Sequence, residues 1–333
     1  MPSSTLRVEQ SINTDELMNR LGLPFRNESL GTRTKSVCAT NITVRRGASG
    51  NAFPNGIWER EKGTFMGFNG CEFCLPVFFH SYSLHDGHTE ETENATLTFI
   101  KYKNRIYAVT CKHIIHHLHS KRKELKDQWY TLSLSLDRVI LHLSYIDHSD
   151  PTKRKDIFRK LKRNLNGEEV DIVIAPINNH WELIKSKKKK RAIDLDNWNE
   201  PNWEEFNMGT AFGYPTEHKE KQGDAVAAPC IKASAEIASK LNKNSTQLTL
   251  FSTLKQPHGY FFSGLSGGVI ILSNKESYET AGIVYEGQPS SSKYFKEKES
   301  NEQAFFSAND ILIKGFIINP NIFSGWLRDV TCS

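Results

Sequence analysis

The most specific chemical signal in the chain is a serine inside a glycine-rich loop. Residues 262–271 read Phe-Ser-Gly-Leu-Ser-Gly-Gly-Val-Ile-Ile, with Ser266 between Gly264 and the pair Gly267 and Gly268. Glycine adopts backbone angles that side chains forbid, so this loop would present a hydroxyl while nearby backbone N–H groups point at a common position. That arrangement suits a serine nucleophile with an oxyanion hole. The alternative interpretation is a plain glycine turn before a buried strand.

Two residues upstream of Ser266 are candidates for a general base and its orienting acid. His113 follows the mostly apolar run 106–111, where a buried strand is expected to end, and Asp171 lies inside the apolar run 170–175. An acid within such a strand requires a partner, because an unpaired buried carboxylate is costly. Each residue also has an ordinary structural interpretation, and the three segments together are more specific than any one of them.

The three segments resemble those of a known enzyme family. Residues 109–114, 170–174 and 264–268 are similar, in the same order, to the catalytic segments of trypsin-like (chymotrypsin-fold) serine peptidases. Residues 212–215 resemble a strand signature early in the family's second barrel, and residues 282–287 resemble its substrate-binding strand. The resemblance implies an all-β fold of two six-stranded antiparallel β-barrels with a short C-terminal helix.

The resemblance also implies a mechanism and a set of partners. Ser266 would attack a peptide carbonyl, His113 would transfer the proton, and Asp171 would hold the imidazole tautomer. Backbone N–H groups of Gly264 and Ser266 would form the oxyanion hole. We expect no metal and no organic cofactor, a protein or peptide substrate, and a regulatory or substrate partner protein.

One departure from the family pattern concerns activation. Secreted digestive members carry an aspartate before the nucleophile, and that aspartate pairs with a freshly cut N-terminus. Leu265 occupies this position here and forms no ion pair. Activation by that route is therefore not expected, and the pattern is nearer to the intracellular, HtrA-like and viral branches.

The substrate-binding residues are less clear from the pattern than the catalytic ones. The candidates are Tyr260, Tyr285, Glu286 and Gly287. Tyr260 stands where trypsin has an acid at the floor of its pocket, which weakens any preference for arginine or lysine. Glu286 would instead receive a basic side chain. Tyr285 replaces a serine that often supports the aspartate of the triad.

The elements that must position these residues are mostly short β-type runs. We expect strands at residues 74–80, 96–102, 105–110, 130–136, 139–145, 170–177, 206–214, 231–237, 247–252, 268–272, 280–285 and 304–311, and helices at 114–126 and 320–328. Many short strands separated by turns predict barrels or sandwiches. The predicted organisation is an N-terminal extension (1–62), a first barrel with a basic connector (63–204) and a second barrel (205–333).

Composition and terminal pattern place bounds on the function. The chain has 333 residues, 38% of them hydrophobic, and a net charge of +5. We find no apolar run of signal-peptide or membrane-spanning length, so we expect a cytoplasmic protein with no membrane association. In that setting the six cysteines are expected to be free thiols rather than a disulfide framework.

Several other motifs compete with the peptidase interpretation. Cys71 and Cys74 resemble half of a zinc site, although packed thiols are the simpler explanation. The histidines at 113, 116, 117 and 119 lack the spacing of a metalloprotease motif. The basic run 185–191 would contact phosphates only nonspecifically, so we do not expect nucleic-acid binding.

The favoured hypothesis is a selective cytosolic processing endopeptidase, for example in a bacterial stress or defence response. Three alternatives stay open at this point. They are a catalytically silent trypsin-like binding module, a nucleic-acid-binding protein, and an esterase or acyltransferase that uses the same triad.

Overall fold

The computed structural model describes residues 69–81, 92–136, 139–161, 164–165, 168–222, 225–254, 262–274, 277–288 and 310–331. The predicted extension 1–62 lies outside these residues, as does Tyr260. No helix among the described residues is long and apolar enough to cross a membrane.

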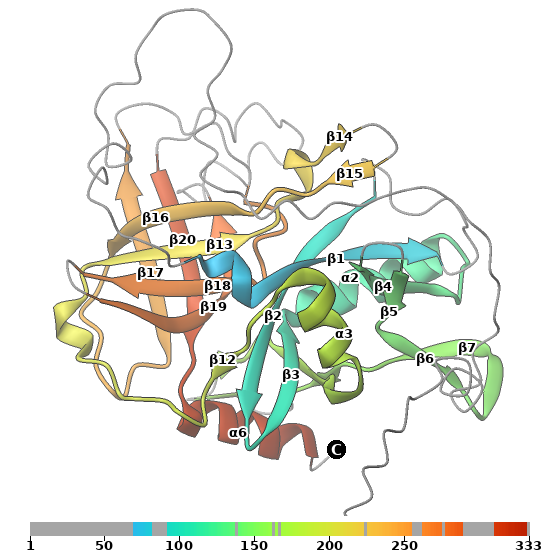
Figure 1. Cartoon of the computed structure of the whole chain (residues 1–333), viewed down its shortest axis with the longest axis horizontal. Helices are drawn as coiled ribbons and strands as arrows, with labels where there is room; N and C mark the ends of the chain where they lie inside the picture. Colours follow the sequence, from blue (N-terminus) through green and yellow to red (C-terminus); the bar gives the residue numbers. More distant parts are fainter. Residues whose placement is uncertain are drawn as a thin grey trace, which may run out of the picture. The chain divides into compact units, whose positions relative to one another are not determined.

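The first half of the described chain forms an eight-stranded sheet (Figure 1). Its hydrogen-bonded order is β5-β4-β1-β2-β3-β11-β8, and β12 pairs with β2 in parallel. The bounds are β1 Cys74–Ser81, β2 Asn94–Tyr102, β3 Arg105–Thr110, β4 Tyr130–Leu136, β5 Val139–His142, β8 Arg159–Lys160, β11 Val173–Pro176 and β12 Ile193–Asp194.

The second half forms a closed six-stranded barrel in the order β13-β16-β17-β20-β19-β18. Its strands are β13 Met208–Gly213, β16 Ile231–Ile237, β17 Gln247–Thr253, β18 Val269–Ser273, β19 Tyr278–Gln288 and β20 Asp310–Ile317. Every pair in this barrel is antiparallel. The predicted all-β fold class and the six-stranded second barrel are confirmed, whereas the first half forms an eight-stranded sheet with one parallel pair instead of a six-stranded antiparallel barrel.

Helices and short hairpins complete the described chain. The α-helices are α2 Lys112–Glu124, α3 Asn178–Lys188 and α6 Pro320–Thr331, and the 3-10 turns are η1 Gly70–Phe73, η2 Trp203–Glu205 and η3 Thr216–His218. Two-stranded pairs join β6 Ser144–Asp147 to β7 Asp150–Asp156, β9 Asn164–Leu165 to β10 Glu168–Glu169, and β14 Glu220–Gln222 to β15 Ala225–Ala227.

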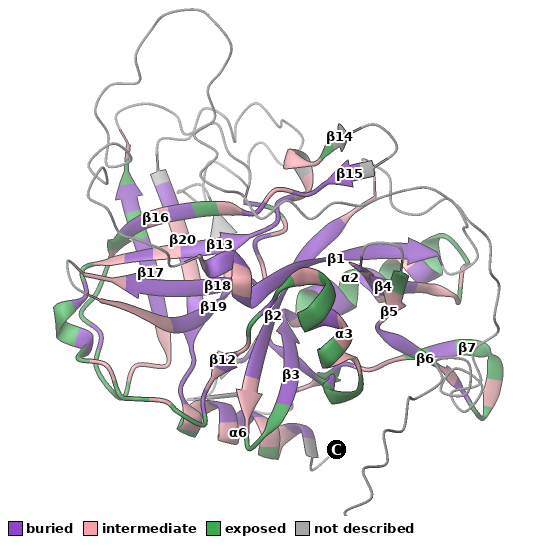
Figure 2. Cartoon of the chain, in the orientation of Figure 1, coloured by how far each residue is buried: buried purple, intermediate pink, exposed green. Residues whose placement is uncertain are grey.

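Strand β2 shows how the sequence produces two differently filled faces. Ala95, Leu97 and Phe99 pack into the apolar core of the first sheet. The alternate residues Asn94 and Thr96, and Thr98 beyond them, are polar yet equally buried, and β2 is coloured as buried over most of its length (Figure 2). Because side chains alternate across a strand, the polar set faces away from that core. It meets the second barrel instead.

Several predicted element boundaries are wrong. Helix α2 begins at Lys112 rather than at 114, so His113 lies in its first turn. Strand β11 begins at Val173, so Asp171 precedes the strand instead of lying in it. The strand expected at 139–145 is divided into β5 and β6, and β20 continues to Ile317 beyond the expected end at 311. Residues 304–309 of that expected strand lie outside the described residues.

The expectation of free thiols is wrong for two cysteines. Cys71 and Cys230 form a disulfide across 159 residues, with Cα atoms 6.2 Å apart. The bond removes Cys71 from any zinc site, whereas Cys74 and Cys111 are buried thiols outside any disulfide among the described residues. Disulfides are typical of oxidising compartments, and the cytoplasmic location stays a prediction.

The basic run 185–191 is not a simple solvated loop. Its first part forms the end of α3, and Lys190 is buried. The Lys190 ammonium donates to the backbone carbonyl of Cys71 at 2.7 Å and lies 3.4 Å from the hydroxyl oxygen of Tyr214. One lysine of this run therefore has a structural role beside the disulfide.

Candidate active site

The first turn of α2 pairs His113 with Asp171. The Nδ1 atom of His113 lies 2.5 Å from Oδ2 of Asp171, and the backbone N–H of His113 donates to Oδ1 at 2.9 Å. The backbone N–H of Lys112 donates to the carbonyl of Asp171. A carboxylate at Nδ1 keeps the proton on that nitrogen and leaves Nε2 free to act as a base.

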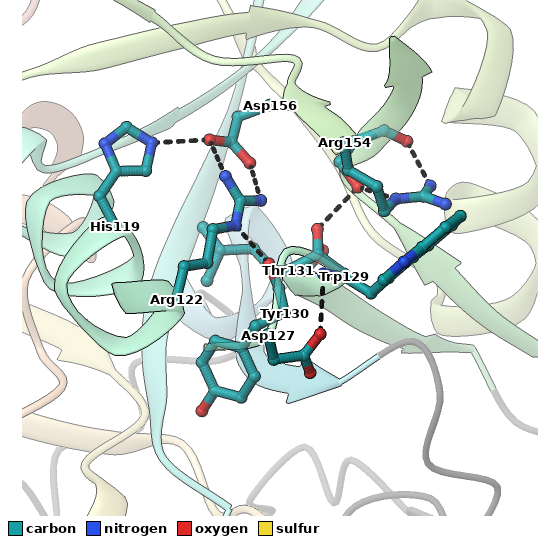
Figure 3. Close-up of polar contacts among 10 residues, drawn as sticks. His119, Arg122, Asp127, Trp129, Tyr130, Thr131, Arg154 and Asp156 are labelled. Atoms are coloured by element: carbon teal, nitrogen blue, oxygen red, sulfur yellow. Dashed lines mark hydrogen bonds and ion pairs between the residues drawn. The ribbon is translucent and has the colours of Figure 1, made fainter. Parts of the chain in front are cut away.

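A second aspartate, Asp156, bonds to helix α2 through His119 and Arg122 (Figure 3). Asp156 at the end of β7 accepts hydrogen bonds from both terminal nitrogens of Arg122, and its Oδ2 lies 2.9 Å from Nε2 of His119. Arg122 also donates to the backbone carbonyl of Tyr130. Burial raises the pKa of Asp156, but the hydrogen bonds from His119 and Arg122 outweigh burial and hold that pKa below its ordinary value. These contacts hold the helix that carries His113.

The glycine-rich loop after residue 262 holds its backbone in a fully bonded arrangement. Gly264 and Gly267 have positive φ angles of 93° and 88°, which glycine adopts without strain. The carbonyl oxygens of residues 263 to 268 each accept a hydrogen bond, in chain order from Thr216 N, Thr96 Oγ1, Gly268 N, Thr96 N, Thr98 Oγ1 and Val284 N. Every peptide plane of the loop is therefore oriented by a partner.

The N–H groups of the same loop divide into two sets. Leu265, Gly267 and Gly268 donate to backbone carbonyls at 3.0, 2.8 and 2.8 Å. Within the part of the chain that the structure describes, the N–H groups of Gly264 and Ser266 have no acceptor. Backbone donors are almost always paired in folded proteins, so two unpaired donors on either side of Leu265 are available for a bound oxygen atom.

Cys111 joins the segment that carries His113 to the loop that carries Ser266. Its thiol is fully buried and donates to the carbonyl of Val284 at 3.2 Å, and that carbonyl also accepts the N–H of Gly267. Burial raises the pKa of the Cys111 thiol well above its ordinary value, the negative charge of Asp171 adds to this effect, and the N–H of Gly267 opposes it. Cys111, two residues before the predicted base, and Gly267, directly after the predicted nucleophile, thus share the carbonyl of Val284.

The structure brings the predicted base, acid and nucleophile to one region of the molecule. No hydrogen bond joins Ser266 to His113 among the described residues. Pairs of this kind are often long before substrate binds. Ser266 is half-buried, and the side chain of His113 is 49% exposed, so both are accessible to a substrate.

Comparison with known proteins gives matches of fold only. No family model matches the chain, and no curated protein matches its sequence. Among solved structures, a thermostable serine protease, AL20, from an extremophilic microorganism matches at 12% identity and a TM-score of 0.41, over 79% of this chain and 98% of that one. The protease Anisep from Arthrobacter nicotinovorans matches at 12% identity and a TM-score of 0.38, over 78% and 96%.

The predicted substrate-binding residues have mixed surroundings. Tyr285 stacks on Phe316 with ring centroids 4.4 Å apart, and its hydroxyl lies 3.5 Å from Oε1 of Gln247. Glu286 accepts an ion-pair hydrogen bond from Lys314 at 2.8 Å. Gly287 lies in β19, opposite Ile313 of β20. Tyr260 lies outside the described residues.

Each of Cys111, His113 and Asp171 offers one possible metal-ligand atom, and these three atoms lie within 4.8 Å of one another. A metal ion could bind to a group with this spacing. Each group already has a hydrogen-bond partner, because the thiol bonds to Val284 and the imidazole to the carboxylate. Two other histidines of α2 are also paired with acids, His117 with Glu93 and His119 with Asp156. The arrangement suits proton transfer better than metal binding.

Sequence reasoning missed the residues of β2 that hold the loop. Asn94 donates from its side chain to the carbonyl of Tyr214, Thr96 to that of Gly264, and Thr98 to that of Gly267. The available signal was the strict alternation Asn-Ala-Thr-Leu-Thr over residues 94–98. Alternation of this kind predicts one polar face, but not that the face is buried.

Proposed function

We propose that this protein is a serine endopeptidase that cleaves peptide bonds through an acyl-enzyme. The observation that carries the proposal concerns the N–H groups of Gly264 and Ser266, which have no acceptor among the described residues. They flank a loop in which the carbonyls of residues 263–268 are all bonded. Donors held in place before reaction stabilise the oxyanion of acyl transfer without reorganisation. The His113–Asp171 pair supports the same reaction class.

The reaction assigns one role to each group. Ser266 Oγ forms a bond to the peptide carbonyl carbon while its proton passes to Nε2 of His113. His113 then gives that proton to the leaving amine as the carbon–nitrogen bond breaks, and water repeats the sequence to release the acid. Asp171 keeps the imidazole in the required tautomer and stabilises its cationic form.

The experiment is covalent labelling with a fluorophosphonate probe, which reacts only with an activated serine. We expect mass spectrometry to find the label on Ser266, and Ser266→Ala to abolish both labelling and peptide cleavage. Ser263→Ala is the matched control, because Ser263 is an exposed serine of the same loop and contributes only a backbone carbonyl to its bonding. This control should label like the native protein.

Two outcomes would contradict the proposal. A folded protein that neither labels nor cleaves any member of a peptide library would be a silent binding module with this fold. Turnover of activated esters without cleavage of any peptide would indicate an esterase or acyltransferase. Cleavage of most library peptides would leave the endopeptidase in place but would contradict the narrower expectation of a selective processing enzyme.

A further inference from the structure

Strand β2 of the first sheet contacts the candidate nucleophile loop of the second barrel at several points. Three of the six loop carbonyls accept hydrogen bonds from Thr96 or Thr98. Both threonines are fully buried. Thr110 completes the arrangement, because its hydroxyl donates to the carbonyl of Thr96 at 2.8 Å.

Thr96 bonds to two carbonyls of the loop, one between the N–H groups of Gly264 and Ser266 and one just after them. Its hydroxyl donates to the carbonyl of Gly264 at 2.6 Å, and its backbone N–H donates to the carbonyl of Ser266 at 3.2 Å. The same hydroxyl accepts the N–H of Tyr214 at 2.9 Å, so both its donor and its acceptor capacity are used. The orientation of the hydroxyl is thereby fixed.

Among the described residues, no charged side chain bonds to residues 263–268 of the loop. Leu265, between the two donors, is fully buried in the apolar core of the barrel. An apolar side chain anchors the loop by burial, but it does not orient a peptide plane. The Thr96 hydroxyl orients instead the peptide group that joins Gly264 to Leu265. This group lies between the two peptide groups that carry the N–H donors of Gly264 and Ser266, so holding its plane restrains both neighbours.

We propose that Thr96 is a positioning residue for the oxyanion hole, acting through its hydroxyl bond to the carbonyl of Gly264. This proposal rests on the serine endopeptidase function proposed above. The first half of the chain then performs two tasks, because helix α2 carries the base and Thr96 of β2 holds the peptide group between the two donor-bearing peptides. A chain organised in this way needs no new N-terminal ammonium to form the hole.

The test compares Thr96→Val, which keeps the shape and removes the hydroxyl, with Thr96→Ser, which keeps the hydroxyl. Thr131→Val is the matched control, because Thr131 is a fully buried threonine of the same sheet whose hydroxyl bonds to Ser144 rather than to the loop. Removing a whole oxyanion-hole donor lowers turnover by about 100- to 1,000-fold. For a displaced donor we expect kcat to fall by about 10- to 100-fold in Thr96→Val.

A positioning role, unlike general packing, should lower kcat without weakening the binding of substrate or product. In Thr96→Val, KM and the affinity for a product peptide should stay within about twofold of the native values. Affinity for a peptide aldehyde, whose hemiacetal oxygen occupies the hole, should fall in parallel with kcat. Thr96→Ser should restore kcat to within about threefold of native, and Thr131→Val should change kcat less than about threefold.

The outcomes separate this proposal from the proposed serine endopeptidase function. If the native protein labels on Ser266 and Thr96→Val retains kcat within about twofold, the positioning role is wrong and the endopeptidase function stands. Equal losses in kcat and product affinity, or equal losses in Thr131→Val, would also overturn it. If the native protein does not label, both proposals fail. Should Thr96→Val not fold, Thr96→Cys, which carries a weaker donor, replaces it under the same criteria.

Discussion

Two histidines of α2, His113 and His119, are each paired with an aspartate, and the two pairs differ in their surroundings. The Asp156 side chain is 10% exposed, and its two oxygens are shared between the guanidinium of Arg122 and the imidazole of His119. Among the described residues no arginine or lysine is paired with Asp171, whose two oxygens accept hydrogen bonds from the ring and backbone N–H groups of His113. The same two residue types therefore form a structural anchor in one place and a candidate catalytic pair in the other.

Asp171→Asn should lower peptide turnover by about 10,000-fold while the protein stays folded. An amide favours the wrong imidazole tautomer, so His113 no longer accepts the serine proton. Asp156→Asn is the control, because it alters the other pair and should reduce stability far more than chemistry. Turnover is measured with a peptide substrate, and folding with circular dichroism. Unchanged turnover in Asp171→Asn would mean that another acid orients the base.

Glu286→Gln should change the relative cleavage of lysine, arginine and uncharged peptides by less than about threefold. The expectation that Glu286 receives a basic substrate side chain assumed a free carboxylate. In the structure Lys314 lies 2.8 Å away, and a half-exposed ion pair of this kind contributes little net energy. Specificity constants for matched peptides give the measurement. A large, selective loss with basic peptides would show that substrate displaces Lys314.

Among the elements, the hairpin of β4 and β5 places a histidine where its charged form is disfavoured. His142 stands opposite Ser133 in this pair and packs 6.2 Å from the ring of His80. Burial, followed by the charges of Arg154 and His80, lowers the pKa of His142 from 6.5 to about 3. The folded hairpin therefore holds a neutral imidazole over most of the acid range.

This lowered pKa predicts a loss of stability in acid. Below about pH 6.5 the unfolded chain binds a proton at His142, whereas the folded chain does not until the pH approaches 3. The free energy of unfolding therefore falls as the pH drops towards 3. Above pH 6.5 both states are neutral and the contribution vanishes. His142→Gln should show a shallower decline between pH 6.5 and 4 in urea titrations. Parallel curves for the two proteins would contradict the prediction.

For the molecule as a whole, covalent and polar contacts join the first sheet to the second barrel. The Cys71–Cys230 disulfide connects η1 to the segment just before β16. Buried Lys190 bonds to the Cys71 carbonyl next to it. Because candidate catalytic residues come from both halves, these contacts bear directly on the site.

Removing the disulfide should lower the free energy of unfolding by ~2–5 kcal/mol, because the bond closes a long loop in the unfolded chain. The measurement is urea unfolding of Cys71→Ser/Cys230→Ser against the native protein, with and without reductant. Cys74→Ala is the control, since it removes a buried thiol that forms no disulfide. Reductant should bring the native protein to the variant's midpoint. An identical midpoint in oxidised and reduced protein would contradict the prediction.

The sequence alone was sufficient for the features whose cause is local. Glycine spacing around Ser266 predicts the loop because positive φ angles require glycine, and Gly264 and Gly267 adopt them. Alternation and turn residues predict most strands, including the hairpin of β2 and β3 around Lys103 and Asn104. The segments that carry His113 and Asp171 were identified from apolar runs of the strand type. Helix α3 was not predicted.

Tertiary structure decided everything that depends on which distant residues meet. Thr96 and Gly264 are 168 residues apart, and Cys71 and Cys230 are 159 apart, so no local pattern predicts either contact. The polar face of β2 is indistinguishable in sequence from a solvated one until a second barrel covers it. The sequence alone suggested that Glu286 is a free acid, whereas the register of β19 and β20 places Lys314 beside it. The physical reason is common to all three cases, because hydrogen bonds and ion pairs form between neighbours in space, and strand register chooses those neighbours.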